Sequence, residues 1–296
     1  MKKIKDYLLL IKPSLSIMVV FSSVMSFMLT PGIKEYTSDS ERWWYVLMLF
    51  VGGMLVTGSA NAINQVSEKD TDAMMKRTAK RPVAAGRMSV TEGWAFAIIT
   101  GIAGVFILGH FFNGLTAGLA AFSLFLYAFI YTPLKKINSI AVLVGAIPGA
   151  LPCLIGWAAG NNDLAMGGWI LFAFQFFWQF PHFWAIAWVA HKDYSAAGFK
   201  LLPSEKGPTK FTAMQTVLYS LLMIPVTVAP YYTGMCSYAD VKGIIGLSLV
   251  LLSNIFLLYR CISLYKNMDV SAARKVMFGS YIYLPVVMLA WLLSKV

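Results

Sequence analysis

Nine stretches of mainly apolar residues follow one another along the chain, each about the 20 residues that an α-helix needs to cross a lipid bilayer. They run over Tyr7–Leu29, Trp44–Gln65, Gly93–Phe112, Leu115–Tyr131, Ser139–Ala158, Gly168–Ala190, Phe211–Tyr231, Val241–Ile262 and Met277–Ser294. Charged residues make up 12% of the 296 residues, about half the share in a soluble domain. The sequence contains no hydrophilic linker long enough to separate domains. It therefore predicts an all-α integral membrane protein, with nine transmembrane helices in a single domain over residues 1–296.

The cations are unevenly divided between the segments that join these stretches. If the N-terminus is cytoplasmic, the inner segments hold all of the 24 Lys and Arg except Lys34, Arg42, Lys242 and Lys295. Because cytoplasmic loops of membrane proteins carry an excess of Lys and Arg, we expect a multi-pass protein of the cell inner membrane. Its N-terminus would be cytoplasmic and its C-terminus outside. The basic start of the chain resembles a signal peptide, but it lacks a clear small-residue cleavage site, so we interpret the first stretch as an uncleaved span.

The net charge of +11 has the same origin. In a soluble protein such an excess would suggest binding to nucleic acid, but here the cations lie in short loops between apolar stretches. The expected partners are therefore the anionic headgroups of membrane lipid and anionic substrates, and not nucleic acid.

Prolines interrupt five of the apolar stretches. They are Pro13, Pro148, Pro152, Pro181, Pro225 and Pro285. Inside a membrane, the carbonyl groups that a proline frees must be satisfied by neighbouring helices or by a wet cavity. For a single proline, a packed kink is as good an explanation as a cavity. Several broken helices in one bundle favour an internal cavity.

A polar stripe continues the second stretch past its cytoplasmic end. Asn64, Glu68 and Asp72 are four residues apart, so on an α-helix they lie on one face. Mg²⁺ is usually held by one or two carboxylates together with substrate phosphate oxygens. We interpret this stripe as functional for two reasons. The preference of cytoplasmic loops for positive charge does not explain carboxylates there, and a polar residue near the bilayer is costly. Asp70 points elsewhere and is expected to be solvated.

Four cations, Lys76, Arg77, Lys80 and Arg81, follow the stripe. Arg77 and Arg81 are again four residues apart, and the guanidinium fork matches phosphate oxygens. For Lys76 and Lys80, placement on the cytoplasmic side is explanation enough. Acids that suit a metal ion beside cations that suit phosphate predict a metal-bridged diphosphate site.

A second polar set belongs to the sixth stretch. On one continuous helix, Gln175, His182 and Asp193 would share a face. Asp193 falls on the same membrane side as Asp72, so the two acidic segments could face each other across a cavity and share metal ions. Most buried histidines only form hydrogen bonds, but an ionisable residue inside a membrane favours a function. The neutral imidazole of His182 is also a natural ligand of haem iron.

Two lysines lie beside these motifs. Lys135 follows Tyr127 and Tyr131 in steps of four, and Lys12 precedes Pro13. Either lysine could reach a diphosphate, or could merely extend to the membrane surface.

In combination, these motifs resemble those of the UbiA-type intramembrane prenyltransferases. The first acidic motif of that family is similar to Asn64-x-x-x-Glu68-x-x-x-Asp72 followed by Lys76-Arg77-Thr78-x-x-Arg81-Pro82. Further segments resemble the branch of the family that farnesylates haem. They are Pro181-His182-Phe183, Lys192-Asp193-Tyr194-x-x-Ala197-Gly198, Leu202-Pro203, Lys12-Pro13, Tyr131-Thr132 and Gly145–Trp157. The resemblance covers nearly the whole chain.

The resemblance implies a nine-helix bundle around a central cavity with a cytoplasmic cap, and Mg²⁺-bound farnesyl diphosphate between the two acidic motifs. It implies transfer of the farnesyl group to a vinyl group of haem B, which gives haem O. The implied catalytic residues are Asn64, Glu68, Asp72 and Asp193, with Glu68, Asp72 and Asp193 as ligands of Mg²⁺. The implied substrate-binding residues are Lys12, Arg77, Arg81, Tyr131, Lys135, His182 and Tyr194. A haem A synthase or a terminal oxidase assembly is the implied protein partner.

The chain departs from the family pattern at two positions. Glu68 stands where the middle acid is usually Asp, and its extra methylene can still reach a cation. Lys192 stands where an acid often precedes Asp193. One carboxylate is therefore present where two are expected, which leaves open whether one or two Mg²⁺ bind.

Two other functions agree with parts of the sequence. A related prenyltransferase that acts on an aromatic acid or a quinone precursor would share the acidic motifs but would not need the Pro181–Phe183 segment. A membrane transporter would hold its acids near mid-membrane. Because Glu68, Asp72 and Asp193 are expected at the inner mouth beside cations, capture of an anion is favoured.

Overall fold

The structure is a computed structural model that describes residues 2–35, 38–204 and 206–296. These residues form helices without any strand, and one isolated β-bridge joins Cys236 and Lys295. The longer helices are α1 (Lys2–Ile11), α2 (Pro13–Leu29), α3 (Asp39–Ser67), α5 (Val90–Phe111), α6 (Gly114–Phe125), α8 (Ala141–Asn161), α9 (Met166–Val189), α11 (Lys210–Tyr232), α12 (Val241–Asn267) and α13 (Val270–Leu293). The shorter ones are η1 (Pro31–Glu35), α4 (Lys69–Met74), the π-helical η2 (Leu126–Tyr131), α7 (Thr132–Leu134) and α10 (His191–Ala196).

Seven of the nine apolar stretches fall on one helix each, Tyr7–Leu29 is divided between α1 and α2, and Leu115–Tyr131 continues from α6 into η2. Fewer helices qualify as membrane spans. Among the described residues, seven are long and apolar enough, and α1 with α2 would add an eighth as one span bent by 44°. Although α9 has 24 residues, it is not among them. It carries Gln175, Gln179 and His182, all buried against other helices. A helix enclosed by protein does not need an apolar surface all round, which explains why hydropathy alone misses α9.

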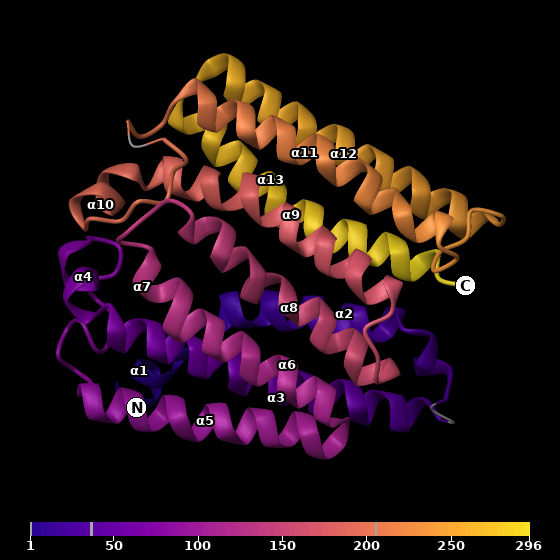
Figure 1. Cartoon of the computed structure of the whole chain (residues 1–296), viewed down its shortest axis with the longest axis horizontal. Coiled ribbons are helices and arrows are strands. Elements are labelled where there is room, and N and C mark those ends of the chain that lie inside the picture. Colours follow the sequence, from indigo (N-terminus) through magenta and orange to yellow (C-terminus); the bar gives the residue numbers. More distant parts are fainter. Residues whose placement is uncertain (1, 36–37, 205) are drawn as a thin grey trace.

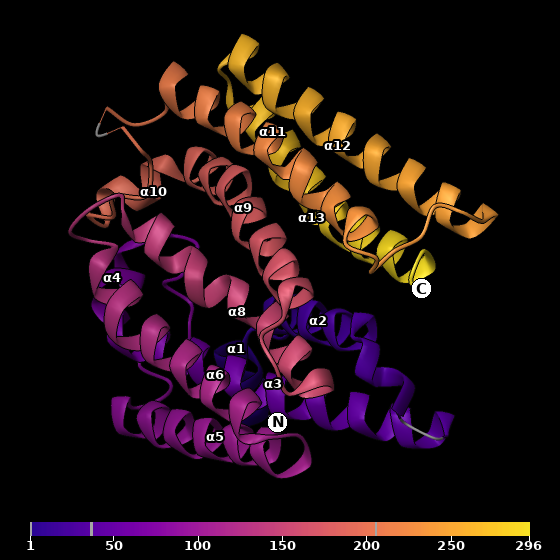
Figure 2. The ribbon, with the colours of Figure 1, turned by 45° about the vertical axis from the view of Figure 1, so that its right-hand side comes forward.

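The helices form two groups that meet at α8 (Figures 1 and 2). In the first group, α3 packs against α2 and α5, and α6 packs against α5 and α8. In the second, α9 packs against α11 and α13, and α12 covers both of these. Because α8 contacts α2, α6 and α9, it is the most enclosed of the candidate spans.

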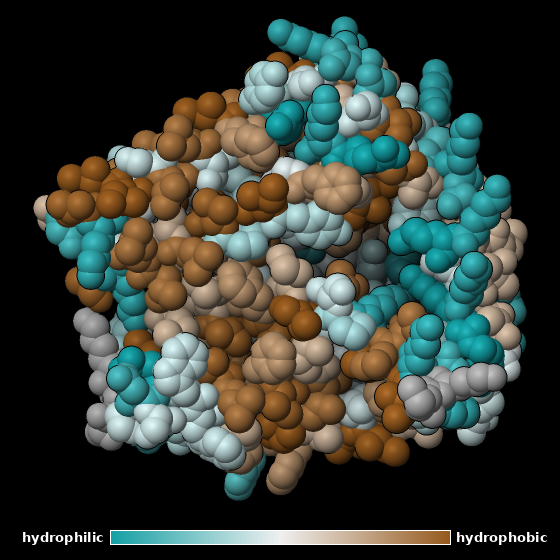
Figure 3. Space-filling model, turned by 180° about the vertical axis from the view of Figure 1, so that it is seen from behind, coloured by the Kyte–Doolittle hydropathy of each residue, from teal (hydrophilic) through white to brown (hydrophobic). Residues whose placement is uncertain are grey.

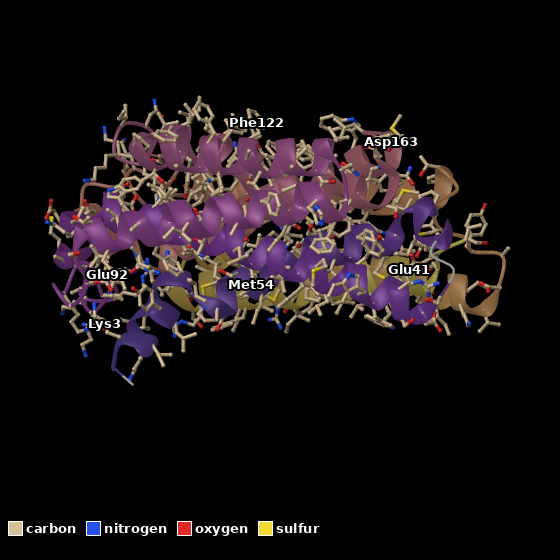
Figure 4. All side chains as sticks on the ribbon, turned by 90° about the horizontal axis from the view of Figure 1, so that it is seen from below. Lys3, Glu41, Met54, Glu92, Phe122 and Asp163 are labelled. Atoms are coloured by element: carbon tan, nitrogen blue, oxygen red, sulfur yellow. The ribbon has the colours of Figure 1, made fainter. Side chains whose placement is uncertain are left out.

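Different parts of the chain form the two ends of the bundle. Helices α4 and α10 lie together at one end, here called the α4–α10 end, and the C-terminus lies at the opposite end (Figures 1 and 2). Figure 4 shows Lys3 and Glu92 at one end of the helices and Glu41 and Asp163 at the other. A hydrophobic band separates hydrophilic side chains at the two ends (Figure 3). This polarity along the helices is what a bilayer requires of a multi-pass protein.

The expectation that prolines break several helices is wrong for most of them. Helices α8, α9, α11 and α13 each continue through their internal prolines. A neighbour satisfies one of the freed groups: Pro152 cannot donate to the carbonyl of Pro148, and the hydroxyl of Ser123 donates to it instead, at 3.3 Å. Only Pro13 accompanies a break, at the bend between α1 and α2.

The second predicted stripe does not lie on one helix. Gln175 and His182 are on α9, which ends at Val189, whereas Asp193 is on α10. The chain leaves helical geometry at Ala190, where the apolar stretch gives way to polar residues. Hydrogen bonds between residues four apart nevertheless cross this junction, from the Ala190 amide to the Ile186 carbonyl at 2.9 Å and from the Tyr194 amide to the Ala190 carbonyl at 3.0 Å.

Candidate active site

The first polar stripe survives the transition from α3 to α4. The amide of Glu68 donates to the carbonyl of Asn64 at 3.0 Å, and the amide of Asp72 donates to the carbonyl of Glu68 at 2.7 Å. Bonds between residues four apart are those of an α-helix, so the stripe keeps one face although Glu68 itself has left helical geometry. All three side chains are buried.

Both carboxylates of the stripe are paired with cations from distant segments. Nη1 of Arg81 donates to both carboxylate oxygens of Asp72 at 2.7 Å. Nζ of Lys135, from the loop after α7, donates to Oε1 of Glu68 at 2.9 Å. Buried charges are stable only when they are paired and hydrogen-bonded. The stripe is therefore a built site, not the solvated end of a helix.

Lys12 provides a third cation. Its Nζ donates to Oδ1 of Asn64 at 3.3 Å, and its backbone is left-handed, with φ of 49°. Hydrogen bonds from α3 hold this conformation. The side chains of Asn61 (3.1 Å) and Gln65 (3.0 Å) donate to carbonyls of the last turn of α1. A non-glycine residue in this region is strained, and such strain persists only where the surroundings impose it.

Asp72 is the most deeply buried acid of the site, with none of its surface exposed. Burial raises the pKa of its carboxyl group, and the Arg81 guanidinium opposes that shift. The hydroxyl of Thr78 donates to the Asp72 carbonyl at 2.8 Å and fixes the turn that brings Arg81 back. The buried charge of Asp72 therefore needs the Arg81 guanidinium, and the position of Arg81 depends on the turn that begins at Asp72.

Aromatic rings surround the Lys135 ammonium group. Its Nζ lies 4.6 Å from the ring centroid of Tyr131 and 6.0 Å from that of Phe199. The rings of Tyr127 and Tyr131 are 5.3 Å apart, both on the π-helix η2. The Thr132 hydroxyl donates to the Tyr127 carbonyl at 2.8 Å. Single π-helical turns occur often at functional sites.

A cavity of about 270 Å³ lies between the two helix groups. Its polar and aromatic lining includes Tyr127, Tyr131, Gln175, Trp178, His182 and Tyr281. The rest is mostly apolar and comes chiefly from α2, α3, α6, α8 and α9. Seen from behind, the surface is hollowed beside the hydrophilic side chains of the α4–α10 end (Figure 3). The internal cavity that the prolines suggested is present, and Pro148 and Pro152 line it.

The structure brings the second acidic segment against the first. Nη2 of Arg77 donates to the hydroxyl of Tyr194 at 2.9 Å, and Met75 packs against Ala197 and Phe199. Asp193 precedes Tyr194 on α10 and is half-buried. The two acidic segments therefore lie together at the α4–α10 end.

The donor set suits Mg²⁺ only together with a substrate. No three His, Cys, Asp or Glu side chains of the described residues converge closely enough to hold a metal ion. Asn64, Glu68 and Asp72 supply hard oxygen donors, but cations already engage all three. Mg²⁺ commonly needs only one or two carboxylates when substrate phosphates complete its shell. The residues present therefore fit a metal ion that enters with a diphosphate.

Lys76, Lys80 and Asp70 are exposed, in agreement with the solvated roles expected for them. Sequence reasoning missed Asn61 and Gln65, which hold the Lys12 break. Asn61 and Gln65 are four residues apart and so share a face of α3, which was a detectable signal in the sequence.

Together, the fold and the site define a multi-pass membrane protein with buried cations beside a mostly apolar internal cavity. The model of the UbiA prenyltransferase family matches residues 19–282. A protoheme IX farnesyltransferase of Flavobacterium psychrophilum is 42% identical over 98% of this chain and 94% of its own length. One of Cytophaga hutchinsonii is 40% identical over 98% and 97%. The chain belongs to the UbiA prenyltransferase family.

Solved structures agree with this fold. A digeranylgeranylglyceryl phosphate synthase superposes with a TM-score of 0.78 at 20% identity, over 99% of both chains. A UbiA homologue of Archaeoglobus fulgidus bound to DMAPP and Mg²⁺ superposes with a TM-score of 0.74 at 14% identity, over 96% of this chain and 98% of that one.

Proposed function

We propose that the chain transfers the farnesyl group of farnesyl diphosphate to a vinyl group of haem B and so forms haem O. The observation that carries this proposal is the set of three cations on the buried acidic stripe beside an apolar cavity. Relatives that match the whole chain under the name protoheme IX farnesyltransferase support the choice of substrates.

The cations bind the diphosphate and stabilise it as it leaves. Lys12, Arg81 and Lys135 surround the stripe and can donate their remaining N–H groups to diphosphate oxygens, while Arg77 lies nearby at the same end. When the bond between C1 of the farnesyl group and oxygen breaks, the electron pair leaves with the diphosphate. Cations already fixed around the departing oxygen stabilise that charge without reorganising, which is the main source of rate in such sites.

Asn64, Glu68 and Asp72 would hold Mg²⁺, with Asp193 serving the second motif. Mg²⁺ held there supplies Lewis-acid neutralisation of the diphosphate. The carboxylates also orient Arg81 and Lys135, and this role does not depend on the metal ion.

The cavity receives the farnesyl group and the acceptor. The faces of Tyr127, Tyr131 and Trp178 can stabilise the allylic cation, and the apolar lining keeps bulk water away from it. The terminal carbon of the haem vinyl group then bonds to C1 of the farnesyl group. The cation left on the inner vinyl carbon takes up water and loses a proton, which gives the hydroxyethylfarnesyl side chain.

The finer membrane arrangement is part of the proposal. We place nine spans in the cell inner membrane, with the α4–α10 end and the N-terminus in the cytoplasm and the C-terminus outside. The segments around α4 and α10 would form the cap over the cavity mouth. A haem A synthase or a terminal oxidase assembly would receive the product.

The proposal is tested by offering the purified protein labelled farnesyl diphosphate with either haem B or an aromatic acid. We expect label in haem only, confirmed as haem O by mass spectrometry. Removal of divalent cations with EDTA should stop the reaction, and added Mg²⁺ should restore it. Label in the aromatic acid, with haem unchanged, would contradict the proposal.

A further inference from the structure

The side chain of His182 makes contacts that have no role in the reaction proposed above. Its Nδ1 lies 2.7 Å from the hydroxyl oxygen of Ser280, on α13. Ser280 is fully buried, and its hydroxyl donates to the carbonyl of Met277 at 2.7 Å. Because a hydroxyl group has a single hydrogen, that hydrogen is not free for His182. With the Ser280 hydrogen on the Met277 carbonyl, His182 donates from Nδ1 and Ser280 accepts, and we assign the tautomer on this pairing.

This hydrogen bond determines the tautomer of the imidazole. A neutral ring with its proton on Nδ1 carries its lone pair on Nε2. No hydrogen bond among the described residues involves Nε2, and Nε2 is not among their enclosed polar atoms that lack a partner. Since His182 lines the cavity, Nε2 is the ring nitrogen left for a ligand there.

The neighbouring rings fix the plane of the imidazole. The ring of Trp178 stacks on it at 4.6 Å with an interplanar angle of 16°, and Tyr281 meets it edge-on at 4.6 Å. The indole of Trp178 also donates to the backbone carbonyl of Ser280 at 2.9 Å. Ser280 therefore holds both the imidazole and the ring that packs on it.

We infer that Nε2 of His182 is an axial ligand of the haem iron, and that Ser280 is its positioning residue. A metal-bound histidine typically donates its other ring N–H to an oxygen, which fixes the tautomer and raises ligand basicity. Here that arrangement stands ready before the acceptor binds. The inference rests on the proposed function, because haem B is the acceptor in it.

The test is resonance Raman spectroscopy of ferrous haem B bound to the full-length protein, read at the iron–histidine stretch. The wild type should show the band, and His182→Ala should lose it and regain it with added imidazole. Ser280→Ala should keep the band at a lower frequency and bind haem about tenfold more weakly, because loss of such a partner costs roughly 10–100-fold in affinity. A purely structural role of Ser280 would not move the frequency.

Two variants serve as controls. His110 and Ser271 are exposed, so His110→Ala and Ser271→Ala should keep the wild-type band and affinity. A band that persists in His182→Ala, or a Ser280→Ala band and affinity equal to the wild type, would overturn the inference. If the wild type converts haem B to haem O but shows no histidine band, this inference fails and the proposed function stands. If it neither binds nor converts haem, the proposed function fails.

Discussion

The Asp72→Asn variant is expected to lose activity about 1,000-fold while it keeps its fold, since loss of one preorganised electrostatic group costs roughly 10²–10³ in kcat. The amide has the size of the carboxylate but not its charge. It can neither orient the Arg81 guanidinium through two oxygens nor hold a divalent cation beside a diphosphate. Arg81 can turn towards water, because its side chain is 20% exposed. The variant should therefore remain folded.

The measurement is haem O formation per folded molecule, with thermal unfolding in detergent as the check on folding. Asp70→Asn is the matched control. Asp70 lies two residues away, and its side chain is 95% exposed. The control should have wild-type activity. Wild-type turnover in a folded Asp72→Asn protein would show that Asp72 has no role in the reaction.

Substitutions of Lys135 and Glu68 should change the stability and the activity of the protein in different ways. Lys135→Met or Glu68→Gln alone is expected to destabilise the protein by about 3–5 kcal/mol, because each leaves a buried charge without its partner. The two side chains are only 10% and 7% exposed. The double variant removes both charges and should recover most of that stability. Its activity should stay as low as that of the single variants, because the diphosphate loses Lys135 and the metal site loses Glu68.

Unfolding in denaturant and haem O formation, both measured on all four proteins, give the result. Lys69→Met is a control from the exposed pair Lys69 and Asp70, with side chains 44% and 95% exposed. It should change stability by less than about 1 kcal/mol. Full activity in the double variant would show that the pair is structural only. A double variant less stable than both single variants would contradict the burial argument.

The first acidic stripe could be found from the sequence because its geometry is local. Asn64, Glu68 and Asp72 stay on one face since hydrogen bonds between residues four apart continue from α3 into α4. The nine apolar stretches were equally visible, because each helix that meets lipid must be apolar over about 20 residues. The extent of α9 was visible from its length of mainly apolar residues, although Gln175, Gln179 and His182 keep it from qualifying as a span by hydropathy.

The remaining features depend on contacts between distant segments. The junction at Ala190 places His182 on α9 and Asp193 on α10, and no periodicity shows where one helix ends and the next begins. The internal prolines do not break their helices, and at Pro148 the freed carbonyl accepts a hydrogen bond from Ser123 on another helix. Ser280 lies 98 residues from His182, and nothing in the local sequence links them.

The central claim is that the acidic segments of α4 and α10 together hold a metal-bound farnesyl diphosphate at the mouth of the cavity. A structure of the full chain with Mg²⁺ and the unreactive analogue farnesyl thiodiphosphate tests it most directly. The account predicts the diphosphate among Lys12, Arg81 and Lys135, metal ions bound through Asp72 and Asp193, and the farnesyl chain in the cavity beside Tyr131. A diphosphate bound elsewhere, or metal ions that touch neither acid, would contradict it.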